Sequence, residues 1–335
     1  MSEGEDGTSQ MLRTSGSLKP GHVGAIVPIP YYLSSIWAGN RLSGLRGLLP
    51  DVDKPIGIAR EVCAYPKAKD NVVGGGPYDG WDLGRLAKER HDVVMGDDPE
   101  SQLIRLAYMD PIEDLSIQVH PGEDYARRVE GDREKSESWY VLEADPGAYV
   151  VAGTTTDDVH ALRETADHDG IDAYARKVPV SEGDFILIPA GTMHACGKNL
   201  LAVEVGSFGG ITYRICDYGR GRALHIDRAF DVLDVASRPL PTHLGPYADA
   251  GETRVRPGVR HRLFASDVVD VSDCWSVDKG NLYHVITAVK NDAVVRVGGL
   301  SYELPYTRSL IVPACERHYE VLGRCRVLCS WHSVS

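Results

Sequence analysis

Residues 183–196, GDFILIPAGTMHAC, decide the fold of this chain. A short apolar run follows the opening Gly-Asp pair, with the length and composition of a buried β-strand. Pro189 and Gly191 then break the pattern, because proline fixes φ and glycine permits a sharp corner. A second strand is expected to begin at His194. The stretch therefore predicts two short strands joined by a tight corner, with an imidazole at the start of the second strand.

Segments of this kind recur along the chain and predict a mainly β fold. Each is roughly five to eight residues long, rich in β-branched and aromatic types, and bounded by Gly, Pro or Asp. Short strands with few helices favour two jelly-roll β-barrels, with a few helices inserted in the N-terminal half, over a doubly wound sheet. Further strands are expected at 103–109, 115–120, 138–144, 148–153, 200–205, 211–218, 282–289, 293–299, 309–314 and 319–329. Helices are expected at 79–95, 122–131, 156–176 and 226–236.

The composition excludes several classes of partner. Lys and Arg number 36 against 48 Asp and Glu, so the formal net charge is −12. Phosphate-rich polymers and anionic membranes would be repelled over most of the surface, which argues against both. The seven cysteines are odd in number and contain no CxxC pair, which does not fit a disulfide framework. The acidic N-terminus has no apolar signal segment, so we expect reduced thiols and a cytoplasmic location.

Side chains with metal-binding groups lie on three of the predicted strands. Strand alternation places Gln118 and His120 on one face of the segment 115–120, opposite its apolar residues. Glu137 shares a strand face with a Trp and a Val, an apolar setting that does not suit a solvated carboxylate. Together with His194, these residues offer two imidazoles, a carboxylate and an amide oxygen. This donor set suits Zn²⁺, with Mn²⁺, Fe²⁺ or Ni²⁺ as alternatives. The competing interpretation is a degenerate site whose side chains only hydrogen-bond one another.

Four motifs occur in the order LSIQVHP, KSESWYVLEADPGA, GDFILIPAGTMHACG and ITYRICDYGRG. Their combination resembles the class I mannose-6-phosphate isomerases of the cupin superfamily, in particular the short bacterial form. The likeness spans residues 30–235. It implies one zinc ion per chain, held by a site that consists of Gln118, His120, Glu137 and His194. It also implies two catalytic residues beyond that site, Glu204 and Arg214.

The resemblance implies a metal-dependent aldose–ketose isomerase. Such an enzyme interconverts mannose 6-phosphate and fructose 6-phosphate, or a related sugar phosphate, through a cis-enediol, so the expected partner is a small sugar phosphate. Arg214 would supply fixed positive charge where negative charge develops. Glu204 is one candidate for the general base, beside a metal-activated water or a nearby histidine. The alternative for these two residues is that they pair with each other as buried charges.

Two departures from the family pattern concern the phosphate end of the substrate. The family places a lysine where this chain has Ala107, and Arg105, on the same strand face, is a candidate replacement. The loop 206–210 before Thr212 reads GSFGG, where short family members carry more polar residues. We therefore keep two alternatives. One is an isomerase of a non-phosphorylated or modified sugar, and the other is a non-catalytic sugar-binding cupin.

The 335 residues are enough for two domains. Residues 1–20 are polar, rich in Gly and Ser, and predict a disordered tail. A segment dense in Pro and Gly at 237–253 predicts a boundary. We expect a catalytic metal-binding cupin domain at 21–240 and a second, metal-free jelly-roll domain at 241–335.

Overall fold

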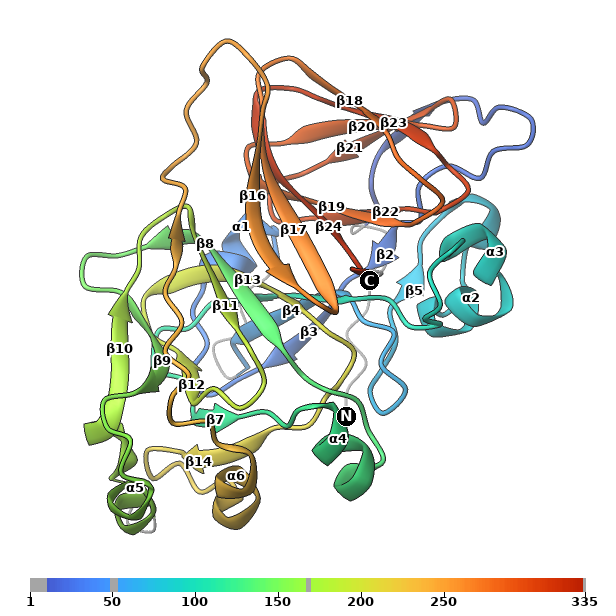
Figure 1. Ribbon diagram of the computed structural model, residues 1–335. Helices are drawn as coiled ribbons and strands as arrows, with labels where there is room; N and C mark the ends of the chain where they lie inside the picture. Colours follow the sequence, from blue (N-terminus) through green and yellow to red (C-terminus); the bar gives the residue numbers. More distant parts are fainter. Residues whose placement is uncertain (1–10, 49–53, 167–169, 334–335) are drawn as a thin grey trace. The chain divides into compact units, whose positions relative to one another are not determined.

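The chain folds mainly as β-sheet, as a computed structural model shows (Figure 1), and the predicted fold class is confirmed. The structure describes residues 11–48, 54–166 and 170–333. The chain forms two compact units, each built from segments that are separated in the sequence. Unit 1 comprises the residues up to Tyr32, Ala59–Ala107 and the residues from Pro246 onward, whereas unit 2 comprises Leu33–Ile58 and Tyr108–Gly245.

Unit 1 contains two antiparallel sheets of five strands each. The first has the order β1-β21-β20-β23-β18, with β1 at Thr14–Gly16, β18 at Cys274–Asp278, β20 at Ala293–Val297, β21 at Leu300–Leu304 and β23 at His318–Leu322. The second has the order β16-β17-β24-β19-β22, with β16 at Arg254–His261, β17 at Phe264–Val271, β19 at His284–Lys290, β22 at Ser309–Val312 and β24 at Cys325–Trp331. A turn at Gly323 divides the predicted strand 319–329 into β23 and β24.

Alternation along the strands separates the core of unit 1 from its surface. On β20, Val295 and Val297 are buried among the apolar residues of both sheets, whereas Arg296 is exposed and lies opposite Glu320 of β23. Within the predicted tail, β1 pairs with β21, while residues 1–10 lie outside the described residues. The smaller elements of unit 1 are β2 Pro28–Ile29, β5 Val72–Val73, η2 Gly76–Tyr78, α2 Leu83–Glu89 and α3 His91–Val94.

Unit 2 is built on two further sheets. A five-stranded sheet has the order β10-β9-β12-β7-β14, with β7 at Ile117–Val119, β9 at Tyr149–Thr154, β10 at Ala175–Pro179, β12 at His194–Cys196 and β14 at Tyr213–Cys216. A seven-stranded sheet has the order β15-β11-β8-β13-β6-β4-β3, with β3 at Tyr31–Ser34, β4 at Ile56–Val62, β6 at Arg105–Met109, β8 at Glu137–Ala144, β11 at Asp184–Ile188, β13 at Leu200–Gly206 and β15 at Thr242–His243. The chain passes from one unit to the other within β3, β4 and β6.

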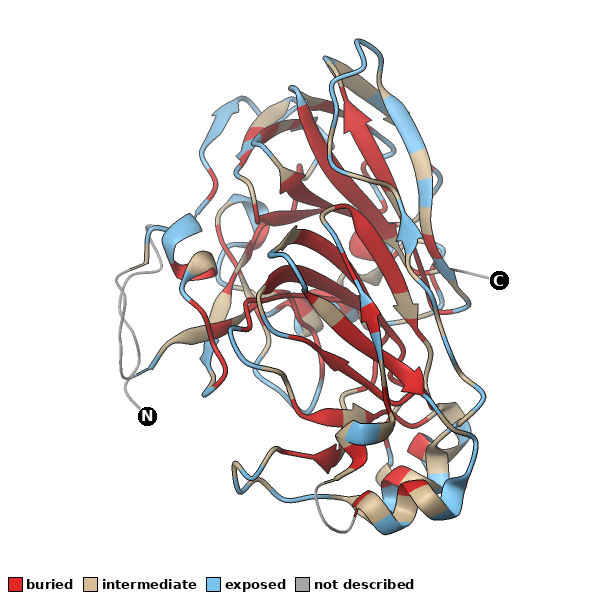
Figure 2. Ribbon diagram, turned by 90° about the vertical axis from the view of Figure 1, so that its left-hand side faces the viewer, coloured by how far each residue is buried: buried red, intermediate tan, exposed pale blue. Residues whose placement is uncertain are grey.

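Two apolar clusters hold unit 2 together, and Figure 2 shows the buried residues concentrated on the strands. The first cluster takes Trp139 and Ile186 from the large sheet and Val150 from the small one. The second lies under the helices, where Ile117 and Val119 of β7 pack with side chains of α5 and α6. This arrangement confirms the predicted alternation of β7. The helices of unit 2 are α1 Arg41–Leu45, α4 Glu123–Tyr125, η3 Ala126–Glu130, α5 Val159–Ala166, η4 Ile171–Tyr174 and α6 Ile226–Val232.

The corner predicted from residues 183–196 lies between β11 and β12. Gly183 donates a backbone hydrogen bond to the carbonyl of Val141 at 2.9 Å, which fixes the start of β11. Gly191 has a φ of +87°, which L side chains rarely adopt, and its N–H donates to the carbonyl of His120 at 2.9 Å. The corner is thus tied to the end of β7, and β12 begins at His194.

None of the seven cysteines forms a disulfide in the structure. In the part of the chain that the structure describes, no helix is long and apolar enough to cross a membrane.

The Gly183 turn provides a test of the fold. A β-carbon at this position would lie 1.9 Å from the backbone oxygen of Gly245, at a φ of +87°. We expect Gly183→Ala to lower the free energy of unfolding by about 2 to 4 kcal/mol, because neither backbone segment can yield without moving its strand. Gly147→Ala is the matched control, since Gly147 has a φ of +84° but open space around it. Urea unfolding followed by tryptophan fluorescence would compare them, and equal losses would contradict the close packing at this turn.

Candidate metal centre

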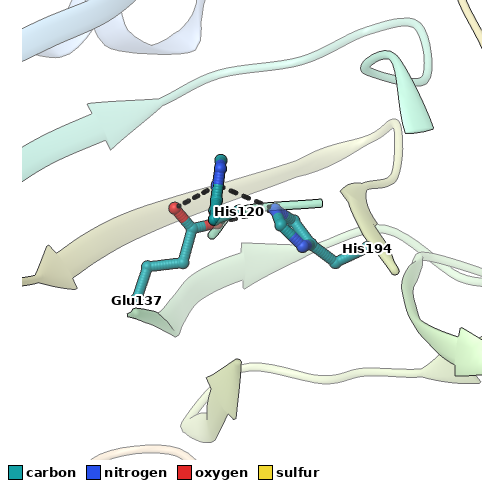
Figure 3. A group of neighbouring side chains, drawn as sticks. All are labelled: His120, Glu137 and His194. Carbon is teal, nitrogen blue, oxygen red and sulfur yellow. Dashed lines mark hydrogen bonds and ion pairs between the residues drawn. The ribbon is translucent and has the colours of Figure 1, made fainter. Parts of the chain in front are cut away.

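Three buried side chains of unit 2 converge on one point (Figure 3). They are His120 after β7, Glu137 at the start of β8 and His194 at the start of β12. The two Nε2 atoms are 3.1 Å apart. Glu137 Oε2 lies 3.2 Å from His120 Nε2, and Glu137 Oε1 lies 3.3 Å from His194 Nε2. Among the described residues, this is the one group of three or more His, Cys, Asp or Glu side chains that is close enough to hold a metal ion.

Each imidazole is oriented by its other ring nitrogen. His120 Nδ1 lies 2.9 Å from the carbonyl oxygen of Ile211, and His194 Nδ1 lies 2.8 Å from that of Thr192. A carbonyl only accepts, so both Nδ1 atoms carry the proton and both Nε2 atoms turn a lone pair toward Glu137. Carbonyl partners of this kind commonly fix metal-binding histidines.

The charge states of these groups are those of metal ligands. Burial lowers the pKa of His120 to about 3, helped by the positive charge of Lys135, so the ring is neutral. Burial alone would raise the pKa of Glu137, but the positive charge of Lys135 outweighs it and holds this pKa well below its ordinary value. Glu137 is therefore an ionised carboxylate beside neutral imidazole.

The separations fit a bound transition metal. Two ligands held at about 2.0 Å from one ion at a tetrahedral angle lie about 3.3 Å apart. The measured separations between ligand atoms are 3.1 to 3.3 Å. Two imidazole lone pairs that face each other at this distance repel unless a cation lies between them. Glu137 Oε2 is also buried and lacks a well-directed hydrogen bond, although Lys135 Nζ is 2.7 Å away.

Lys135 is the functional candidate that the sequence reasoning missed. Its buried Nζ lies 2.8 Å from His120 Nε2 and 2.7 Å from Glu137 Oε2, so it provides a positive charge at the cluster. The signal was present in the motif at 135–148, where this lysine stands two residues before the carboxylate. Residues two apart in extended chain share a face, which would have placed Lys135 beside Glu137.

The loop before β8 holds Lys135 through backbone hydrogen bonds. Glu134 donates its N–H to Glu123 Oε2 at 2.7 Å, and its carbonyl accepts from Gly209 N–H and from the hydroxyl of Ser207 at 2.9 Å each. A β-carbon at Gly209 would lie 2.2 Å from the carbonyl oxygen of Arg133, so only glycine fits beside the loop. The glycine-rich loop 206–210, which departs from the family pattern, therefore packs directly against the segment that carries Lys135.

Gln118 and Arg214 lie in the same cross-strand row as His194. In the register of the small sheet, Gln118 of β7 pairs with His194 on one side and with Arg214 of β14 on the other. Gln118 Nε2 is 3.3 Å from His194 Nε2. Arg214 donates from Nη1 to the carbonyl of Ala223 at 2.9 Å, and its Nε lies 3.8 Å from Asp217. Burial and the nearby Arg222 lower the pKa of Arg214.

Glu204 faces the interior from β13. It pairs with Trp139 in the register, so both side chains lie on the core face of the large sheet. The negative charges of Glu137 and Glu204 both contribute to the raised pKa of Cys196, after burial. Within the described residues, Glu204 forms no ion pair and therefore does not pair with Arg214. The interpretation of these two residues as mutually compensating buried charges is thus not supported.

The two residues that concern binding of the substrate phosphate lie on β6, and they are Ala107, at the position of the family lysine, and Arg105, the candidate replacement for that lysine. Ala107 is buried. Arg105 is also buried, with its guanidinium 5.2 Å from the centre of the Tyr65 ring. In the motif after Arg214, Arg220 donates to the carbonyl of Asp114, and Asp217 binds Arg222, so these contacts stabilise the loop.

A jelly-roll barrel with a buried His-Glu-His cluster defines a metal-binding cupin. No protein-family model matches the chain. The mannose-6-phosphate isomerase of Streptococcus mutans is 31% identical over 314 residues, which cover 90% of this chain and 98% of that protein. The enzyme ManA of Bacillus subtilis, also a mannose-6-phosphate isomerase, is 32% identical over 221 residues, or 63% of this chain and 68% of ManA. The chain belongs to the mannose-6-phosphate isomerase family, as its motifs predict.

Solved structures agree with the fold. The mannose 6-phosphate isomerase of Bacillus subtilis superposes with a TM-score of 0.82 at 24% identity, covering 92% of this chain and 99% of that one. The Salmonella typhimurium enzyme, in a crystal structure with its substrate and zinc bound, superposes with a TM-score of 0.72 at 14% identity. That match covers 93% of this chain and all of the Salmonella chain.

The metal centre can be tested through Glu137. We expect Glu137→Ala to reduce bound zinc from about one ion per chain to about a tenth of that or less, because the cluster loses its only negative charge. Glu143→Ala is the control, since Glu143 lies on the same strand but is partly exposed. Elemental analysis of both purified proteins after dialysis would measure the difference. Equal zinc contents would contradict this assignment.

Proposed function

We propose that this protein is a metal-dependent isomerase that interconverts mannose 6-phosphate and fructose 6-phosphate through a cis-enediol. The observation that carries the proposal is the buried convergence of His120, Glu137 and His194 beside Lys135, in a chain of this family. We assign the metal to these three ligands with Gln118 as the fourth. Zn²⁺ is the preferred ion, because two imidazoles with one carboxylate and one amide suit it.

The reaction moves one proton between two neighbouring sugar carbons. We assign this transfer to Glu204, which is buried on the core face of β13 and has no cationic partner among the described residues. A carboxylate in a site with little water can remove the proton at C2 of the aldose and return it at C1. Gly206 has no side chain to separate Glu204 from Glu137, since a β-carbon there would lie 3.6 Å from atoms of both residues. This leaves space beside the cluster for the reacting carbons.

Negative charge develops on the sugar oxygens as the proton leaves. Lys135 supplies an ammonium group that is already desolvated and held by its loop, so little reorganisation accompanies the reaction. We assign Arg214 to the same task from the neighbouring strand, because it shares the row of Gln118 and His194. A bound Zn²⁺ supplies Lewis-acid stabilisation of the same charge.

The proposal also concerns the substrate and the location of the protein. Ala107 favours a second candidate, an isomerase of a free or modified sugar, because the family lysine is absent at that position. A cytoplasmic location accords with seven cysteines that form no disulfide and with a phosphorylated substrate, which does not cross membranes unaided. The division expected from the sequence, with a metal-binding domain at 21–240 and a metal-free domain at 241–335, differs from the two units of the structure, because Ala59–Ala107 groups with the C-terminal strands. We assign the metal to unit 2, which holds His120, Glu137 and His194.

The function is tested by isomerisation in heavy water. We expect the zinc-loaded protein to convert fructose 6-phosphate to mannose 6-phosphate with deuterium at C2, seen by proton NMR, because the enediol exchanges with solvent. Free fructose should react at least about a hundredfold more slowly in kcat/KM, since it lacks the charged contacts of a phosphate. Chelation should abolish the reaction, and added Zn²⁺ should restore it. Equal rates with free fructose would favour the second candidate, and no exchange with any sugar would contradict catalysis.

Substitution of Arg214 tests whether catalysis can be lost without loss of the metal. We expect Arg214→Ala to keep its zinc and to lose about 10²- to 10³-fold in kcat/KM, because one fixed positive charge is removed from the transition state. Arg228→Ala is the control, since Arg228 is an exposed arginine on α6. Turnover and zinc content would be measured on the same preparations. Loss of zinc in Arg214→Ala, or full turnover, would contradict the role given to this residue.

A further inference from the structure

A basic cleft of about 700 Å³ lies in unit 1, and all of its lining residues belong to that unit. Its charged lining residues are Lys19 from the N-terminal segment, Arg296 and Glu320 from the first sheet, and Arg317 from the β22–β23 connection. The imidazoles of His22 and His318 also line it. None of these residues takes part in the proposed isomerase chemistry.

The walls of the cleft are fixed to one another. The turn between β20 and β21 contains Gly298 and Gly299, both with positive φ, and Lys19 donates its N–H to the carbonyl of Gly298 at 2.9 Å. A β-carbon at Gly299 would lie 2.8 Å from Lys19 Cγ, so glycine lets the N-terminal segment pack on the turn. The buried Glu316 accepts hydrogen bonds from Val23 N–H at 2.7 Å and Gly24 N–H at 2.9 Å. The cleft is therefore already shaped before a ligand arrives.

The connection between β22 and β23, which also lines the cleft, contains the same Pro-Ala-x-x-x-His motif as the corner of the metal-binding barrel, but its histidine faces the other way. Residues 313–318 read PACERH, with the proline and the histidine spaced as in PAGTMH at 189–194. His194 points inward to the cluster, whereas His318 is exposed and lies 2.9 Å from Asp278. The connection is held by Lys279, whose N–H donates to the carbonyl of Arg317 at 2.8 Å and whose Nζ donates to that of Pro313 at 2.9 Å. The motif thus places Arg317 and His318 at the cleft.

The charges of the cleft are not balanced within the described part of the chain. Three permanent cations and one carboxylate line the cleft, and that carboxylate, Glu320, lies 3.8 Å from Arg296 in a loose ion pair. Two further carboxylates beside the cleft, Glu316 and Asp278, bind the lining histidines His22 and His318 rather than its permanent cations. The side chains of Lys19 and Arg317 form no ion pair with any described residue. A concave surface concentrates such a field, and this one stands out on a chain of net charge −12. Uncompensated cations around a cleft match a ligand with at least two negative charges.

We propose that this cleft binds a small phosphorylated molecule, such as a phosphate ester or a diphosphate, at a site separate from the metal centre. Lys19 and Arg317 contact the phosphate oxygens, and Arg296 of β20 adds positive charge to the same cleft. The arginines offer paired N–H donors that match phosphate oxygens. The volume is within the range of small-molecule sites, so the non-phosphate part of the ligand also fits.

Cys315 provides a local readout, because it lines the cleft and is exposed, whereas the other six cysteines are buried or half-buried. Its alkylation by neutral N-ethylmaleimide would be followed by peptide mass spectrometry on the full chain. Inorganic phosphate, pyrophosphate, glucose 6-phosphate and ADP would be the probes. We expect a phosphorylated probe to slow the alkylation, and the most protective probe to identify the class of ligand. The metal ligands belong to unit 2 and the cleft residues to unit 1, so the substitutions below distinguish binding at the cleft from binding at the metal centre, and the result is independent of the proposed function.

Substitutions assign the protection to the cationic groups. We expect Lys19→Gln and Arg317→Gln each to weaken the protective probe about tenfold, because each removes a charge-assisted hydrogen bond. Arg324→Gln is the control, an exposed arginine of unit 1 outside the cleft, and it should leave protection unchanged. Thermal unfolding would verify that the variants fold. No protection by any probe at about 10 mM would overturn the proposal. Equal protection by sodium chloride at matched ionic strength, or an equal loss in Arg324→Gln, would also overturn it.

Discussion

The metal centre depends on one electrostatic constraint. Two imidazole lone pairs and a carboxylate are buried within hydrogen-bonding distance of one another, so the site needs a positive charge. His120 Nε2 and His194 Nε2 face each other at 3.1 Å with Glu137 beside both, and none of these atoms can donate a proton. Such a group is costly without a cation. Lys135 supplies one positive charge within the protein, and the separations suit a transition metal. The carbonyl partners of both histidines and the backbone bonds of the lysine loop hold the acceptors in this arrangement.

Sheet register determines which residues share this interior. In the small sheet, His194, Gln118 and Arg214 form one cross-strand row, while Ile117 and Val119 pack under the helices. A slip of one residue in β7 would bring these apolar side chains inward and turn the amide out. The corner at Gly191 prevents such a slip, because its N–H is bonded to the carbonyl at the end of β7. The site therefore depends on the same backbone contacts as the fold.

Sequence alone predicted what local patterns determine. The corner and the strand alternation around Gln118 follow from side-chain periods and from proline and glycine, as do the segments that contain the helices. The helix predicted at 156–176 was too long, because Ala175 and Arg176 belong to β10, and its residues 167–169 lie outside the described residues. Lys135 was missed because it lies before the first residue of the predicted strand, although extended-chain alternation places it on the same face as Glu137. The separation of Glu204 from Arg214 could not be predicted, since it depends on the loop that carries the partners of Arg214. The grouping of Ala59–Ala107 with the C-terminal strands is also a tertiary property without a local signal.

The two Pro-Ala-x-x-x-His connections show why a motif does not specify a site by itself. In both, the histidine is the first residue of a strand, yet His194 lies inward and His318 outward. The difference is one of register, because Tyr319 of β23 packs in the core opposite Val297, and its neighbour must then face solvent. Inside the first barrel the imidazole meets a carboxylate and a second imidazole, which favours a cation. Outside the second barrel the imidazole binds the carboxylate of Asp278 and lines the cleft together with Arg317 and Arg296. The neighbours that the register supplies, rather than the motif, determine what each histidine binds.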